Sequence, residues 1–133
     1  MEKSEQRNEI IRVFRKFARL GLDSERLNPA QIYKKIDVVC VSRRARLDML
    51  AVYDTLRLLW LNDETEIMEA LKCVYFSGKE YRLTKYDISS RVLALANENY
   101  CDERTIYRRL ERARSLYVKI REREGLLDAQ PYP

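Results

Sequence analysis

Histidine is absent from this chain of 133 residues, which removes the commonest general base and the commonest metal ligand. Glycine and proline occur three times each, too rarely for the many turns of a β-sandwich or barrel. The chain has no glycine-rich phosphate loop, no apolar run of the ~18 residues that span a membrane, and no signal peptide at its start. We therefore expect no enzymatic activity, no cofactor, no metal, no small-molecule substrate and no membrane partner.

Cysteine is also scarce. Cys40, Cys73 and Cys101 are odd in number, far apart and without the C-x-x-C spacing of metal or redox sites, and each has apolar neighbours. We interpret them as small buried hydrophobic side chains in the reducing cytoplasm, and a reactive thiol is the less favoured alternative.

The chain does contain helical periodicity. The spacing of its apolar residues predicts six helices and no strand. The predicted N-caps are Asn28, Ser42, either Asn62 or Asp63, Thr84 and Asp102, and Gly21 is predicted to end the first helix. The third helix is apolar on most of its sides, which leaves two explanations: it is the central helix of the N-terminal half, or it lies at a subunit interface.

Positive charge is concentrated on the last predicted helix. Residues 63–103 hold five basic side chains against nine acidic ones, whereas residues 104–123 hold eight against two. With Ile106, Leu110 and Ala113 facing inward, helical geometry places an outward arc at Arg104, Thr105, Arg108, Arg109 and Arg112. Helix-turn-helix proteins offer such turns to the major groove, so we favour a DNA-binding helix over an ordinary solvated basic face.

Three motifs follow one another in the second half. They are an aromatic-glycine corner at Tyr75, Phe76 and Gly78, an acidic residue with isoleucine at Asp87 and Ile88, and a helix carrying Thr105, Ile106, Arg108, Arg109, Arg112 and Ala113. Together they resemble the promoter-binding fourth region of bacterial sigma factors and the ArpU-like and RinA-like phage regulators built on it. The connection at residues 97–101 lacks the usual glycine, and the N-terminal half has no core-polymerase or promoter-melting motif. An accessory regulator is therefore the better fit.

Periodicity and resemblance together imply an all-α fold, in which an N-terminal bundle of about three helices precedes a three-helix, sigma-like helix-turn-helix domain. We assign residues 1–62 to oligomerisation or polymerase contact, 63–124 to DNA binding and 125–133 to a C-terminal tail. The resemblance implies a sequence-specific, double-stranded DNA-binding transcriptional regulator of phage or prophage origin, with residues 103–117 as its recognition helix. We expect a cytoplasmic homodimer, and RNA polymerase is a further candidate partner.

Individual roles follow from the family pattern and the helix geometry. The candidates for base edges are Arg104, Thr105, Arg108 and Arg109, because arginine can bond guanine in bidentate fashion. The candidates for phosphates are Arg112, Lys85, Arg91 and Tyr107, although packing is an equal alternative for Tyr107.

A second basic cluster is formed by Arg43, Arg44 and Arg46. Cations in the first turn of a helix oppose its dipole, which costs ~0.3–1 kcal/mol each. Two explanations are open: the cluster meets phosphate or an acidic partner, or the second helix runs through it without a break.

Two other functions compete with the regulator. A subunit like the small terminase would capture viral DNA for packaging and would form a ring. An adaptor would use the last helix against an acidic protein and never touch DNA.

Overall fold

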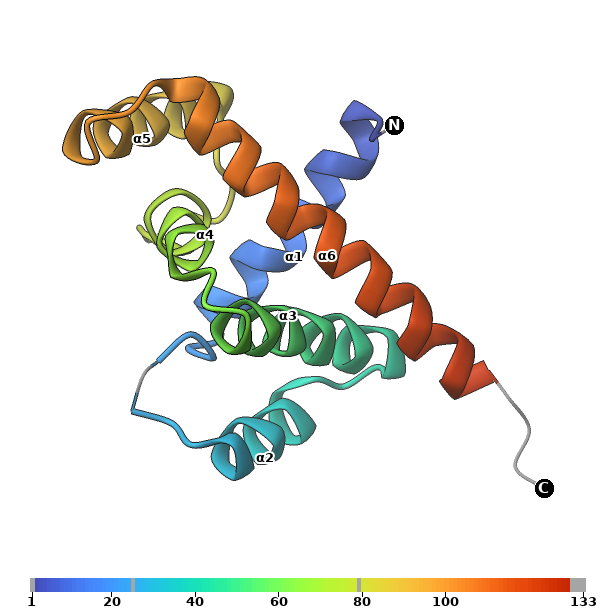
Figure 1. The fold of residues 1–133 in the computed structure, drawn as a ribbon. Helices are drawn as coiled ribbons and strands as arrows, with labels where there is room; N and C mark the ends of the chain where they lie inside the picture. Colours follow the sequence, from blue (N-terminus) through green and yellow to red (C-terminus); the bar gives the residue numbers. More distant parts are fainter. Residues whose placement is uncertain (1, 25, 79, 130–133) are drawn as a thin grey trace.

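The computed structural model describes the chain apart from residues 1, 25, 79 and 130–133 and the side chains of residues 125–129. Its described part is all-helical, with six α-helices and no strand (Figure 1). The elements are α1 (Ser4–Arg19), α2 (Pro29–Val39), α3 (Arg43–Leu61), α4 (Thr65–Ala70) continuing into the π-helical segment η1 (Leu71–Phe76), α5 (Lys85–Glu98) and α6 (Glu103–Ala129). The expectation of an all-α chain is confirmed.

Short polar side chains start four of these helices as the sequence predicts. Asn28 accepts a hydrogen bond from the Gln31 amide at 2.9 Å, and Ser42 accepts one from the Ala45 amide at 3.1 Å. Before α5 and α6, the oxygens of Thr84 and Asp102 accept in the same way from the amides three residues on. Each cap satisfies a helix-terminal N–H that would otherwise lack a partner.

The helix ends show where the local prediction is wrong. After α1 the chain turns at Gly21, after α3 at Asp63 and after α5 at Tyr100, each with a positive φ. At all three ends the next amide bonds back to a carbonyl five residues earlier, as in a Schellman motif. Asp63 thus ends α3 rather than capping α4, whose N-cap is Glu64 without a side-chain hydrogen bond.

One hydrophobic core runs through the described helices. Phe14 of α1 lies 5.8 Å from the ring of Tyr75 in η1 and 5.5 Å from the ring of Tyr117 in α6. α6 crosses the whole molecule, packing on α5 and α4 with its first part and on α3 further along (Figure 1). The core therefore continues across residue 62, where the sequence suggested a division between two parts.

α3 is central along most of its length. It packs against α1, α2, α4 and α6 and buries Met49, Val52 and Leu59 completely. At its end, however, Trp60 is 66% exposed and Leu61 is 70% exposed. The core thus explains the apolar character of most of α3, while Trp60 and Leu61 in its last turn leave an apolar surface.

Two arginines bind the main chain of the segment that leads from η1 to α5. Arg15, buried in α1, donates to the carbonyls of Tyr75, Ser77, Gly78 and Glu80 at the end of η1. Arg91 of α5 donates to the Val74 and Ser77 carbonyls, both at 2.9 Å. Cations are favoured at the carbonyl end of a helix, so α1 and α5 are both tied to one cluster of main-chain acceptors.

All three cysteines are free thiols, with Cys40 buried and Cys73 and Cys101 half-buried. Burial raises the pKa of Cys40 and of Cys73 above the usual thiol value, which keeps both protonated and poorly nucleophilic. In the described ranges, no helix is both long and apolar enough to cross a membrane, and no His, Cys, Asp and Glu side chains are grouped to hold a metal ion.

Candidate nucleic-acid interface

The candidate interface is built on α5, a four-residue connection (Asn99–Asp102) and the start of α6. Val92 and Leu95 of α5 and Ile106 and Leu110 of α6 are buried, and the two helices pack on one another. Figure 1 shows that α5 and α6 point in clearly different directions. The inward residues therefore fix the orientation of the first turns of α6.

Local capping also fixes the start of α5. Thr84 and Asp87 form a reciprocal pair, in which each side chain accepts from the other residue's amide. The hydrogen bonds from Thr84 lower the pKa of the exposed Asp87 carboxyl. The carboxylate form thus holds this helix start at neutral pH.

Arg104 and Arg108 form the exposed part of the interface. They lie one turn apart on α6, both are exposed, and neither guanidinium pairs with any of the described residues. Asp102 caps the helix just before them. These two arginines have no structural partner within the described chain, and Arg104 in the first turn opposes the helix dipole.

The other side of this helix faces α4. Arg109 Nη2 lies 3.6 Å from Glu66 Oε2, and Arg112 Nε lies 3.6 Å from Glu64 Oε1. Thr105 is half-buried and its hydroxyl donates to Asp102 at 3.3 Å. The exposed, unpaired part of α6 is therefore narrower than helical periodicity alone predicts, because Arg109, Arg112 and Thr105 have partners. Because both ion pairs are longer than a hydrogen bond, they contribute little and can be exchanged for another anion.

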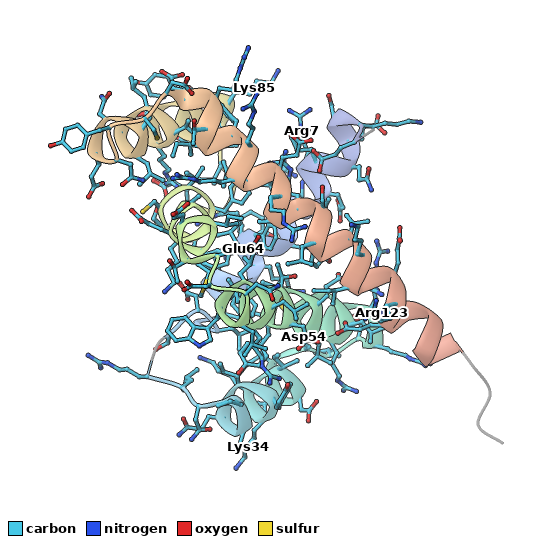
Figure 2. All side chains as sticks on the ribbon, in the orientation of Figure 1. Arg7, Lys34, Asp54, Glu64, Lys85 and Arg123 are labelled. Atoms are coloured by element: carbon cyan, nitrogen blue, oxygen red, sulfur yellow. The ribbon has the colours of Figure 1, made fainter. Side chains whose placement is uncertain are left out.

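Lys85 and Tyr107 lie on the remaining side. Lys85 begins α5 and its side chain points away from the helices, near the side chain of Arg7 from α1 (Figure 2). Tyr107 is 40% exposed, and both residues line a pocket at the start of α5. The structure thus brings these two phosphate candidates together beside the exposed arc.

Arg91 lies elsewhere. Besides its two carbonyl acceptors, its Nη2 donates to Glu80 at 3.1 Å, and its side chain is only 20% exposed. The structure therefore gives Arg91 a helix-capping role, and its phosphate role stays a prediction.

The second basic cluster is distant from the arc. Cys40 is extended and α3 starts afresh at Arg43, so the explanation of an unbroken helix is wrong. Arg46 Nε lies 3.4 Å from Asp37, which supplies an acidic partner from α2, while Arg44 is exposed. Asp48, one turn along α3 from Arg44, contacts Arg121 of α6. Arg121 lies ~26 Å along α6 from Arg104, which shows how far the cluster is from the exposed arginines.

Arg114, a buried arginine in the middle of α6, was not among the site residues that the sequence predicted. Its Nε donates to both carboxylate oxygens of Glu2, at 3.1 and 3.0 Å, and its Nη1 donates to the Tyr75 hydroxyl at 2.7 Å. A signal was present, because position 114 follows Leu110 by four residues and precedes Tyr117 by three, which puts it on the inward stripe.

No family model matches this chain, and neither the curated proteins nor the solved structures contain one that is significantly similar to it. Functional inference therefore depends on the residues and their geometry.

Proposed function

We propose that this chain is a sequence-specific, double-stranded DNA-binding transcriptional regulator, in which α4–η1, α5 and α6 act as a sigma-like helix-turn-helix unit. The first turns of α6 enter the major groove in this proposal, with Arg104 and Arg108 at the base edges. Bidentate arginine contacts to guanine are the commonest specific contacts in such complexes, each contributing ~1–3 kcal/mol of discrimination.

The observation that carries the proposal is the exposure of Arg104 and Arg108 without a partner among the described residues. An arginine in the first turn of a helix, next to unpaired main-chain amides, is unfavourable without an anion and favourable beside a phosphate. The rigid packing of Ile106 and Leu110 beneath them supports a role in recognition, because groups that read a surface must be held in place.

The remaining contacts follow from position. Lys85 and Tyr107 line the same pocket, which supports a shared contact with the phosphates of one DNA strand, while Arg109 and Arg112 would have to leave Glu66 and Glu64 to reach DNA. We assign Lys85, Tyr107 and Arg112 to phosphate contacts. We assign Arg109 and Thr105 to base contacts that are secondary to those of Arg104 and Arg108. Phosphate contacts set affinity and salt dependence, whereas base contacts set sequence choice.

We further propose that the regulator is a phage-derived cytoplasmic homodimer. The exposed apolar end of α3, with Trp60 and Leu61, supports self-association, since two copies are needed to read two half-sites. The three free cysteines fit a reducing compartment. RNA polymerase remains the candidate for a further partner.

The test is binding to a random DNA duplex at low salt, measured by fluorescence anisotropy. We expect the wild-type chain to bind and the double variant Arg104→Ala/Arg108→Ala to bind at least tenfold more weakly. The control is Arg12→Ala, which removes an exposed arginine of α1 that pairs with Glu9 and should leave duplex binding unchanged. No binding by the wild type at low salt would overturn the proposal in favour of a protein-binding adaptor.

Light scattering of the purified chain separates the regulator from the packaging subunit. A dimer is expected, and Trp60→Glu should convert it to a monomer because a buried charge would be costly at the contact. A large closed ring would instead favour a DNA-packaging subunit like the small terminase.

A further inference from the structure

A cavity of about 780 Å³ opens between the start of α1, η1, the first turn of α5 and the middle of α6. This volume is typical of sites for small molecules. Its lining combines the apolar and aromatic side chains Tyr86, Ile88 and Tyr107 with the cations Arg7, Lys85 and Arg114 and the carboxylates Glu2 and Glu111. Arg7 and Lys85, which both line this cavity, are labelled in Figure 2, where their side chains lie near one another. Mixed walls of this kind suit a ligand with an anionic group and an apolar body.

Arg114 is the fixed cation of this cavity. It is 7% exposed, and a buried guanidinium is costly unless an anion and hydrogen-bond acceptors surround it. Tyr75 holds one side of it, and burial raises the pKa of the Tyr75 hydroxyl, so this group stays protonated. Nη2 of Arg114 donates to none of the described residues, and the side chain lines the cavity.

The anion now on Arg114 is the carboxylate of Glu2. It reaches the guanidinium from the extended segment before α1, and its other neighbour is Arg7 Nε at 3.5 Å. Glu2 is therefore a carboxylate attached to the chain by a short non-helical segment, bound by a buried arginine inside a larger cavity. Few backbone contacts would have to break for it to leave.

We propose that this cavity binds a small organic carboxylate with an apolar body, and that Glu2 is a built-in competitor for the same place. The carboxylate of the ligand takes the position of the Glu2 carboxylate on Arg114 and Arg7. Its apolar body lies against Tyr86, Ile88 and Tyr107. Both oxygens of Glu2 share the single Nε–H of Arg114, which shows that a carboxylate can reach this guanidinium.

The site also has a consequence for DNA, which rests on the proposed function. Lys85 and Tyr107, the two clustered phosphate candidates, line this cavity. A bound carboxylate places negative charge beside Lys85 and fills the space next to Tyr107. Occupation should therefore weaken duplex binding, which makes the ligand a negative effector.

The test is titration of the full-length chain with phenylacetate, followed by amide chemical shifts, with no DNA present. We expect Glu2→Gln to bind phenylacetate at least fivefold more tightly than the wild type, because glutamine competes without a charge. The matched control is Glu5→Gln, an exposed carboxylate on α1 that does not line the cavity and should leave the affinity unchanged. Phenylacetamide, the neutral analogue, should not bind.

Equal affinities for wild type and Glu2→Gln, equal shifts with phenylacetamide, or tighter binding of phenyl phosphate than of phenylacetate would each overturn the carboxylate site. Arg7→Gln provides a second variant that removes a half-exposed cation with little risk to folding, and it should weaken phenylacetate binding severalfold. Adding a duplex to the phenylacetate-saturated Glu2→Gln chain then tests the effect on DNA, and unchanged duplex affinity would overturn that effect alone. Failure of the wild type to bind any duplex would overturn the proposed function, while the titration still decides the site.

Discussion

Two arginines in the first two turns of α6 and two arginines further along the same helix are used in opposite ways. Arg104 and Arg108 are exposed and contact no carboxylate among the described residues. Arg114 and Arg121, further along, hold Glu2 and Asp48 at 3.0 and 2.8 Å and join α6 to the segment before α1 and to α3. One helix thus carries a set of arginines free for a partner and a set that holds the fold together.

This difference changes the meaning of the charge count. Four of the eight basic side chains between residues 104 and 123 pair with carboxylates from other elements, namely Arg109, Arg112, Arg114 and Arg121. The others, Arg104, Arg108, Lys119 and Arg123, are exposed and unpaired within the described chain. A run of basic residues in a sequence therefore overstates the positive charge on the surface. The exposure of each basic side chain, and whether it pairs with a carboxylate, has to be known before a function is inferred from the run.

The largest effect, on the free energy of unfolding, should come from the arginines that join α6 to other parts of the fold, Arg114 and Arg121. Arg114→Ala should lower the free energy of unfolding by about 3 kcal/mol, because it removes the buried cation that donates to both Glu2 and Tyr75. Urea denaturation followed by circular dichroism measures this value. Arg108→Ala is the matched control and should change stability by less than ~0.5 kcal/mol. Equal losses for the two variants would remove the distinction between the two sets.

The second effect concerns sequence preference. Arg108→Ala should reduce the discrimination between a selected duplex and a random one by about 1–3 kcal/mol, roughly 5- to 150-fold in relative affinity. The selected duplex comes from oligonucleotides bound out of a random pool.

The contrast to Arg108→Ala is Arg112→Ala, which should weaken binding to every duplex alike and reduce the salt slope by about 1. If both variants lowered affinity for all duplexes equally, Arg108 would be a phosphate contact and not a reader of bases.

A smaller effect is expected at the turn that precedes the free arginines. Tyr100 has a φ of 53° and is 97% exposed, so it strains the backbone and packs against almost nothing. Tyr100→Gly should raise the free energy of unfolding by about 0.5–1 kcal/mol. Asp63→Gly, at the equivalent place after α3, should gain less because aspartate tolerates this conformation. A loss of stability in Tyr100→Gly would show that the tyrosine ring has a partner.

The smallest effect lies at the far end of α6. Glu124 is half-buried and hydrogen-bonded to Asp54, and burial with this neighbour raises its pKa from 4.5 to about 8. A carboxyl whose pKa rises on folding binds its proton more tightly in the folded chain. Its contribution is complete below pH 4.5 and is lost as the pH rises through about 8.

We therefore expect the Tm of the wild type to fall over this pH range by more than that of Glu124→Gln, which cannot titrate. Because the carboxyl is partly solvated, the difference should be small. Matching pH profiles for the two chains would mean that Glu124 keeps an ordinary pKa in the fold.

Local chemistry was sufficient to predict much of the fold. The caps Asn28, Ser42, Thr84 and Asp102 act on amides three residues away, so the sequence pattern contains both partners. Asp63 misled the prediction because one residue can serve the end of one helix or the start of the next, and packing decides between them. The length of α6 was also underestimated, since the recognition segment was placed at 103–117 with a tail from 125, whereas the helix continues to Ala129.

The candidate site was less predictable. The partners Arg114 and Glu2 are 112 residues apart in the chain, and Arg91 reaches the carbonyls at the end of η1 only because α5 folds back across them. Such contacts depend on tertiary arrangement, which helical periodicity does not contain. Periodicity could reveal only that an arginine at position 114 lies on an inward stripe.

The length of α6 has a mechanical consequence. A helix of 27 residues is ~40 Å long, several times the ~12 Å width of the major groove. If its first turns lie in the groove, its remaining turns project from the duplex as a stiff arm with α3 and α2 fastened to the outer end. A protein docked on that end would be held at a set reach from the DNA, and inserting one helical turn into the arm would move it outward by ~5.4 Å.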